Sequence, residues 1–344
     1  MPAQPVNPHQ AFARLAHRTG LLGETFHRKR SLAPLVSALG GIRGDRLDQA
    51  HMSLAARLPD YKPALLLREI QEKHALVRTW GLRGQLQIVA TPELSEFLAA
   101  AAAAPRWRRF LEGKTKLSPQ ARLRLLKRLC PRVISRDALK DAFPDTSMRL
   151  FILREAAQAG HILWKDGEGS AASFVWTKDV LGRSVEPERD FRPLIRRYLG
   201  SYAPLTANDL GSWLGVTVAA ARLLMAKHRV VEVVEEGEVA SQFIRPDDLK
   251  ELLSMRKSAA RGLVVVPPGD PFMLAYKTRY RVAGGDDNPG LVFLDARVVA
   301  RWSLSRAGAA MTVLDRDVGK RAEKAVRSLL ERSGVEASLT AAAP

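Results

Sequence analysis

Residues Leu76–Val89 read Leu-Val-Arg-Thr-Trp-Gly-Leu-Arg-Gly-Gln-Leu-Gln-Ile-Val, and they give the most specific structural prediction in the chain. In the second half of this segment Gln85 and Gln87 alternate with Leu and Ile, and a period of two is typical of a half-buried strand. Gly81 and Gly84 allow the chain to turn sharply just before that strand. The segment therefore predicts a β-hairpin with its tip near residue 83.

A helix is expected directly before this hairpin, over Pro63–His74, because its apolar residues recur near one helical face. Arg78 and Arg83 would lie near the tip of the hairpin. A helix followed by a basic hairpin is the layout of a winged helix, in which the helix enters a DNA groove and the hairpin, or wing, lies along phosphates. We therefore expect both arginines to bind DNA, and the amides of Gln85 and Gln87 to bond base edges or water. The alternative is a tight hairpin without a functional role.

The chain is strongly basic: its 344 residues include 54 Lys and Arg against 36 Asp and Glu, a formal net charge of +18. This excess predicts a polyanionic partner, nucleic acid before membrane, and we expect double-stranded DNA. The length predicts two to four folded units. No apolar run has transmembrane length and residues 1–17 lack a signal-peptide core. We therefore expect a monomer of the cytoplasm, associated with the nucleoid and with no membrane partner.

The sequence gives no signal for a metal or a cofactor. Cys130 is the only cysteine, and its apolar helical context predicts an inert core residue. The seven histidines lack the spacing of metal ligands, and no Gly-rich phosphate-binding motif follows a strand. We expect no metal, no nucleotide cofactor and no other cofactor.

Half of the net charge is concentrated in residues 106–132, where ten cations accompany a single acidic residue. Trp and Phe residues are interleaved with these cations, which favours phosphate contact over a merely solvated helix face. A second segment, residues 276–281, also mixes rings with cations, and there a solvated basic loop is an equal alternative. From these two segments we expect DNA contacts by Arg106, Arg108, Arg109, Lys114, Lys116, Lys277 and Arg279.

An order of three helices followed by a hairpin occurs twice more. Helices are expected over 118–129, 135–142 and 146–158 before a hairpin at 161–177, and again over 191–202, 206–214 and 217–228 before a hairpin at 230–244. This order favours winged helices but also occurs outside DNA-binding proteins. The last hairpin is acidic, so we expect it to pack against protein or to face away from DNA. After residue 262 the pattern turns to strands, and a closing helix is expected over 320–331.

The hairpin segment also carries a family resemblance. Arg-Thr-Trp-Gly-Leu-Arg-Gly-Gln-Leu-Gln, from Arg78 to Gln87, resembles the signature Arg-Thr-Trp-x-x-Arg-Gly-Thr-Leu-His of a bacterial family of winged-helix DNA-binding proteins. That family includes the alkylpurine and crosslink-repair DNA glycosylases. Residues 267–272, Pro-Pro-Gly-Asp-Pro-Phe, are similar to the entry into the family's C-terminal unit.

In the glycosylase relatives the catalytic motif follows Leu-Gly-x-apolar and is Gln-apolar-Gln in one branch and Gln-apolar-Asp in the other. Here Leu39-Gly40-Gly41-Ile42 matches this lead-in, and Arg43-Gly44-Asp45 follows. The resemblance therefore places Asp45 at the catalytic acceptor, while Arg43 replaces the first Gln of the motif. Asp48 and Gln49 lie close by, and a shifted alignment would give either of them this role.

Hydrolysis of an N-glycosidic bond to an N7-alkylated purine needs little help at the cationic leaving group. It needs an acceptor that stabilises positive charge on the sugar and orients or deprotonates water. The carboxylate of Asp45 can accept a proton, whereas the guanidinium of Arg43 cannot accept at all and would repel a cationic lesion. A further interpretation is that Arg43 and Asp45 form only a loop ion pair of little energetic weight.

Together these features predict an α+β protein with three tandem winged-helix units and a C-terminal β-rich unit, folded as a C-shaped clamp on DNA. We expect a first unit with the active-site loop over 12–110, a second over 111–183, a third over 184–255, the β-rich unit over 256–333 and a disordered tail over 334–344. The predicted function is a monofunctional DNA glycosylase for N7-alkylated purines or interstrand crosslinks. The alternative is a non-enzymatic winged-helix protein, such as a transcriptional regulator, with a degenerate catalytic motif.

Overall fold

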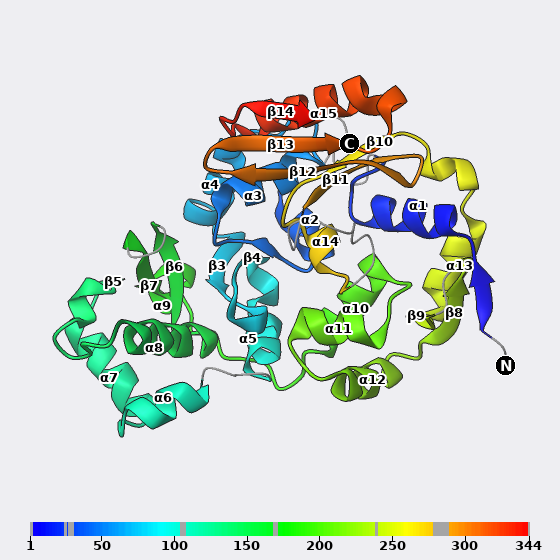
Figure 1. Cartoon of the computed structure of the whole chain (residues 1–344). Helices are drawn as coiled ribbons and strands as arrows, with labels where there is room; N and C mark the ends of the chain where they lie inside the picture. The colour runs from blue at the N-terminus through cyan, green and yellow to red at the C-terminus, as the bar shows by residue number, and fades with distance from the viewer. Residues whose placement is uncertain are drawn as a thin grey trace.

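The computed structural model describes residues 3–23, 26, 31–103, 108–167, 171–237, 240–277 and 289–342, without the side chains of 108–110. Within these residues it is a mixed α+β fold with three separate sheets. Figure 1 shows the C-terminal sheet at the top, the N-terminal strand at the right and the second unit at the lower left. No helix in the described residues has the length and apolarity needed to cross a membrane.

One order of elements occurs three times: a helix, a short extended segment, two helices or turns, and a hairpin whose last strand pairs with the extended segment. In the first unit these elements are α2 (Ala33–Ala38), β2 (Ile42–Arg43), α3 (Leu47–Ala55), α4 (Pro63–Gln71), β3 (Leu76–Trp80) and β4 (Leu86–Ala90). In the second they are α7 (Pro119–Leu129), β5 (Val133–Ser135), a 3₁₀ turn (Asp137–Leu139), α8 (Thr146–Gln158), β6 (Ile162–Asp166) and β7 (Ser173–Trp176). In the third they are α10 (Arg192–Tyr202), a bridge from Leu205 to Phe243, α11 (Ala207–Leu214), α12 (Val218–Ala226), β8 (Val231–Glu235) and β9 (Gln242–Ile244).

Side-chain caps begin several of these helices where the sequence has Ser, Asp or Thr. The Ser118 hydroxyl accepts a hydrogen bond from a backbone N–H of α7, and the Asp145 carboxylate does the same for α8. Thr206 and Asp209 form a complete capping box on α11, at the start of the helix predicted over residues 206–214. The helix predicted over residues 135–142 was wrong, because this segment contains the end of β5 and the 3₁₀ turn.

The hairpin predicted from residues 76–89 is present, but it is not a protruding wing. Its strands β3 and β4 lie inside a six-stranded sheet with the order β2-β4-β3-β6-β7-β5, and β3 pairs with β6 through Arg78 and Trp164. The rings of Trp80 and Phe174 stack across the junction with centroids 5.2 Å apart. All five residues of β3 are buried as a consequence, and the first two units share one sheet.

The acidic hairpin of the third unit packs against the N-terminus of the chain. Strand β1 (Gln4–Val6) runs parallel to β8, and Asn7 donates a hydrogen bond to Glu236 over 3.0 Å. Helix α1 (Pro8–Arg18) follows, and its buried Arg14 donates to two carbonyl oxygens at the end of α10. Residues 8–18 therefore lie with the third unit, although the sequence pattern placed the chain from residue 12 onward with the first.

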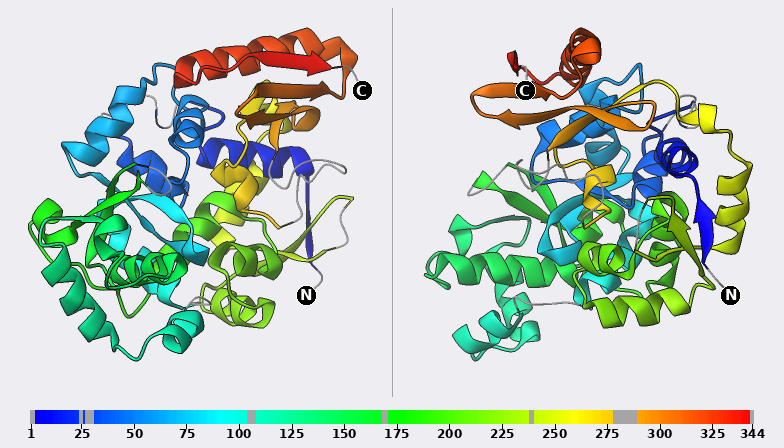
Figure 2. Two further views of the ribbon diagram at one scale, coloured as in Figure 1. Left: turned by 60° about the vertical axis from the view of Figure 1, so that its left-hand side comes forward. Right: turned by 45° about the vertical axis from the view of Figure 1, so that its right-hand side comes forward.

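The C-terminal unit is a five-stranded sheet covered by a long helix. Strands β10 (Leu263–Val266), β11 (Gly290–Leu294), β12 (Arg297–Ser305) and β13 (Gly308–Val313) pair antiparallel, and α15 (Gly319–Ser333) covers the sheet, as Figure 2 shows. The predicted disorder of the tail was wrong for residues 339–342, which form strand β14 (Leu339–Ala342) parallel to β13. An unpaired sheet edge recruits such a strand because its backbone groups need partners.

The remaining α-helices of the described residues connect these units. They are α5 (Leu94–Ala102), α6 (Arg108–Lys114), α9 (Thr177–Leu181), α13 (Pro246–Ser254) and α14 (Pro271–Leu274). Three clusters of buried side chains form the core. One lies in the second unit, one joins the first unit to the C-terminal sheet and α15, and the largest joins α1, α5 and the third unit to α14. Cys130, in the second unit, is 2% exposed, so its predicted place in the core is confirmed.

Candidate functional site

The loop with the candidate catalytic residues is held in place by the hairpin. Arg43 on β2 pairs with Gln87 on β4, and the N–H of Gly44 donates to the carbonyl oxygen of Leu86 over 2.9 Å. The guanidinium of Arg78 donates to the carbonyl oxygen of Gly44 over 2.6 Å from the interior of the sheet. The backbone around residue 44 is therefore fixed from two sides, and Asp45 follows it at the surface.

Asp45 is paired with Arg43 through both of its carboxylate oxygens. Arg43 Nε donates to Oδ1 over 3.0 Å and Arg43 Nη2 donates to Oδ2 over 2.5 Å. The two side chains are 26% and 43% exposed, so the pair is accessible to water and to a ligand. Arg46 and Asp48 form a second pair with the same spacing, and Asp48 Oδ1 also accepts from the N–H of Gln49.

The C-terminal unit supplies a wall of this site through residues 267–270. Gly269 has a φ of +70° and lies so close that an added Cβ would be 2.8 Å from Gln49 Oε1 and 3.3 Å from Arg43 Cδ. The next residue, Asp270, forms a fully buried ion pair with Arg57 at the end of α3, with two contacts of 2.7 Å. Segments more than 200 residues apart in the sequence thus form one site.

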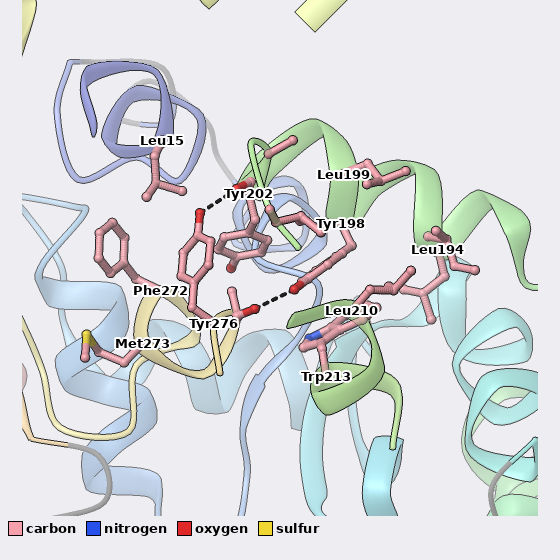
Figure 3. Close-up of a cluster of buried hydrophobic side chains, with 14 of the residues drawn as sticks. Leu15, Leu194, Tyr198, Leu199, Tyr202, Leu210, Trp213, Phe272, Met273 and Tyr276 are labelled. Atoms are coloured by element: carbon pink, nitrogen blue, oxygen red, sulfur yellow. Dashed lines mark hydrogen bonds between the residues drawn. The ribbon is translucent and has the colours of Figure 1, made fainter. Parts of the chain in front are cut away.

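The third unit fixes the start of the same loop. The hydroxyl of Tyr202 donates to the carbonyl oxygen of Leu39 over 2.8 Å. Gly40 lies against the Trp213 ring, since a Cβ added to Gly40 would be 3.0 Å from a ring carbon. Figure 3 shows Tyr198, Tyr202 and Tyr276 in this cluster, with Tyr276 donating to the backbone of residue 202. Burial of the Tyr202 phenol raises its pKa above the ordinary value, so it remains a hydrogen-bond donor at neutral pH.

The hairpin tip carries Arg83 and the two glutamines. Arg83 is exposed, packs its stem against Gly215 of the third unit and donates to Gln85 Oε1 over 3.1 Å. Partial burial of its guanidinium lowers the pKa of Arg83, and the nearby charge of Arg43 lowers it further. Gln87 accepts from the N–H of Leu82 within the turn, so this amide oxygen is already engaged. The structure therefore brings Arg43, Arg83, Gln85 and Gln87 near one another.

The other predicted DNA contacts are dispersed. Arg78 is 4% exposed and contacts Gly44 and Trp164, so its prediction as a surface phosphate contact was wrong: the pairing of β3 with β6 encloses it. Lys114 and Lys116 are exposed near α6, which lies at the outer end of the second unit in Figure 1, and Lys114 is 3.6 Å from Asp145. Lys277 is exposed after α14. Arg106 and Arg279 lie outside the described residues, as do the side chains of Arg108 and Arg109.

Gln49 belongs to this site although the motif comparison gave it only as an alternative. Its side chain is 8% exposed, and its Oε1 has no hydrogen-bond partner in the described part of the chain. The sequence signal for the neighbouring wall was present in residues 267–272, but the approach of Gly269 to Gln49 has no local signal. Among the described residues no three His, Cys, Asp or Glu side chains form a group that could hold a metal ion.

Two comparisons with known proteins gave matches. Residues 36–341 match the family described as DNA glycosylase AlkZ-like. Among solved structures, the DNA glycosylase AlkZ of Streptomyces sahachiroi superimposes with a TM-score of 0.75 over 99% of this chain and 100% of that chain, at 20% sequence identity. At this identity the structural likeness concerns the fold. The comparison with curated protein sequences gave no significant match.

Proposed function

The chain belongs to the AlkZ-like family of DNA glycosylases, DNA-binding proteins of DNA repair, and from this membership we propose a specific activity for it. The protein hydrolyses the N-glycosidic bond of N7-alkylated purines in duplex DNA, including purines joined in an interstrand crosslink. The observation that carries this proposal is the position of Asp45. It is an accessible carboxylate on a loop fixed by β4, Arg78 and α10. The motif resemblance puts this residue at the catalytic acceptor.

The proposed reaction needs one acceptor and one water molecule. Alkylation at N7 makes the purine a cation, so the C1′–N9 bond breaks with its electron pair leaving on the neutral base. The water oxygen bonds to C1′, and one water proton passes to the Asp45 carboxylate, which also stabilises positive charge on the sugar. No metal ion is required by this scheme.

Arg43 has two effects in this proposal. It donates to both Asp45 oxygens in the free protein and so competes with an attacking water for the carboxylate. Its guanidinium suits bidentate contact with a phosphate, so a DNA strand entering the site competes with Asp45 for it. Arg83 lies close enough to contribute to the same positive field.

We further propose that the three repeated units act as winged helices around a DNA duplex, as a monomeric C-shaped clamp associated with the nucleoid. The repeated pairing of the first extended segment with the last hairpin strand supports this assignment. Only the units' exposed cations would then contact phosphate, because Arg78 is interior and the third hairpin is acidic and paired with β1. Binding is expected to weaken steeply with salt.

Release of N7-methylguanine from a methylated duplex tests the activity, with Asp45→Asn as the catalytic variant. The matched control is Asp48→Asn, because Asp48 forms an equivalent pair with Arg46 two residues earlier. We expect Asp45→Asn to reduce the single-turnover rate at least about a hundredfold, the usual effect of removing a general base, and Asp48→Asn to change it little. Full activity of Asp45→Asn would disprove the residue assignment.

One observation favours the second candidate, a non-enzymatic DNA-binding regulator. Both oxygens of the only motif carboxylate are occupied by an arginine that replaces an amide of the family motif. A regulator would release no base from methylated or crosslinked duplex and would prefer particular sequences at physiological salt. The same base-release assay therefore separates the two candidates.

A further inference from the structure

Gln49 carries a buried acceptor that no described residue engages. Its side chain projects from the first turn of α3 and is 8% exposed, and Oε1 has no hydrogen-bond partner among the described residues. Buried side-chain acceptors in folded proteins nearly always have a partner, so an exception beside a candidate active site indicates a partner acquired in another state.

Arg43 is a side chain close to Gln49 that could supply that partner. Gln49 Oε1 and Arg43 Cδ lie 2.8 and 3.3 Å from the same point, the position of an added Cβ on Gly269. The guanidinium of Arg43 extends from Cδ toward Asp45 in the free protein. Because both atoms lie close to this one point, we infer that rotation of the Arg43 side chain can direct an N–H group toward Gln49 Oε1. The glycine leaves room for this movement, since a side chain at residue 269 would occupy the same space.

We propose that Gln49 is a positioning residue. When DNA occupies the site, its Oε1 accepts a hydrogen bond from the Arg43 guanidinium, and this releases Asp45 for catalysis. This inference rests on the proposed function. In the free protein Arg43 covers both Asp45 oxygens. In the complex Arg43 donates to Gln49 and to a neighbouring phosphate, and Asp45 takes the proton of the attacking water while the C1′–N9 bond breaks. The amide lost from the family motif at residue 43 is thereby compensated by an amide on α3.

The test uses a double-mutant cycle in the full-length protein on an N7-methylguanine duplex. Gln49→Met keeps the length and volume of the side chain but removes the acceptor, and Gln49→Glu keeps an acceptor. Arg43→Gln removes the guanidinium that would donate a hydrogen bond to Gln49. Single-turnover rates and duplex affinities are measured for the wild type, each single variant and the double variant, with thermal melting to verify folding.

We expect Gln49→Met to lower the single-turnover rate about tenfold or more, the usual effect of one lost hydrogen bond to a charged group, with duplex affinity nearly unchanged. Gln49→Glu should keep the rate within a few-fold of the wild type. In the Arg43→Gln background, Gln49→Met should have little further effect, because no guanidinium remains to be positioned. A purely structural role would give the same loss in both backgrounds.

Four outcomes would overturn the inference. An unchanged rate for Gln49→Met, or an equal loss with and without Arg43, would reject the positioning role while leaving the glycosylase activity in place. A well-folded Gln49→Met protein whose loss is wholly in duplex affinity would also reject it. Absence of base release by the wild type and by Arg43→Gln would overturn the proposed function itself, and the positioning role with it.

Discussion

Replacing Arg57 by Met should destabilise the protein more than any surface substitution of an arginine. Arg57 and Asp270 are both 0% exposed and share two contacts of 2.7 Å. Arg57 also donates to the carbonyl oxygens of Thr19 and Ser53, each over 2.7 Å. Met fills most of the side-chain volume but leaves the Asp270 carboxylate buried without its cation. The expected loss of unfolding free energy is about 3–5 kcal/mol, the cost of breaking a buried pair by removing one partner.

The measurement is thermal and urea unfolding of the wild type and variants at pH 7. A loss of this size should lower Tm by roughly 4–7 °C in a chain of this length. Arg297→Met is the matched control, because Arg297 pairs with Asp315 at 2.8 Å with 71% of its own side chain exposed. The control should lose less than about 1 kcal/mol.

The combined variant with Arg57→Met and Asp270→Asn should be more stable than Arg57→Met alone, since no unpaired charge then remains in the core. If Arg57→Met melted within a degree or two of Arg297→Met, the buried pair would not be what joins the first unit to the C-terminal loop. The same result would remove the main support for Gly269 as a fixed wall of the site.

Three further predictions concern DNA binding, pH and the glycine. Lys114→Ala and Lys116→Ala should each weaken duplex binding irrespective of the DNA sequence. Each should also reduce the slope of log affinity against log salt concentration by about 1. An unchanged slope would exclude that lysine from phosphate contact. Burial lowers the pKa of His51, which bonds Tyr61, so the folded protein holds this ring neutral while the unfolded chain takes up a proton as pH falls below about 6.5. Stability should therefore fall with pH in that range, and His51→Gln should flatten the dependence of Tm on pH. Gly269→Ala forces a Cβ to within 2.8 Å of the buried amide oxygen at a φ of +70°, so it should slow base release and lower Tm, and a neutral effect on both would contradict the described close approach.

Local patterns in the sequence predicted local structure well. The period of two after Gly84 and the glycines before it predicted the hairpin of β3 and β4, which the structure contains. The predicted α+β class with a C-terminal β-rich unit also agrees with the three sheets. These features depend on residues within a few positions of each other, where steric preference and hydrophobic spacing act directly.

The candidate site was predicted only in part, because its second half comes from a distant segment. The motif comparison located Arg43 and Asp45, and their mutual pairing followed from opposite charges two residues apart. The close approach of Gly269 to Gln49 could be known only from the fold, since the two residues are 220 positions apart in the sequence.

The sequence by itself determined the positive charge, the hairpin, the loop with its carboxylate and the family. Only the tertiary structure decided that Arg78 lies inside a sheet shared by two units, that the N-terminal helix joins the third unit and that the last residues form a strand. The physical reason is that a residue pattern specifies which faces and strand edges must be covered. Which segment covers them is selected by packing among elements far apart in the chain.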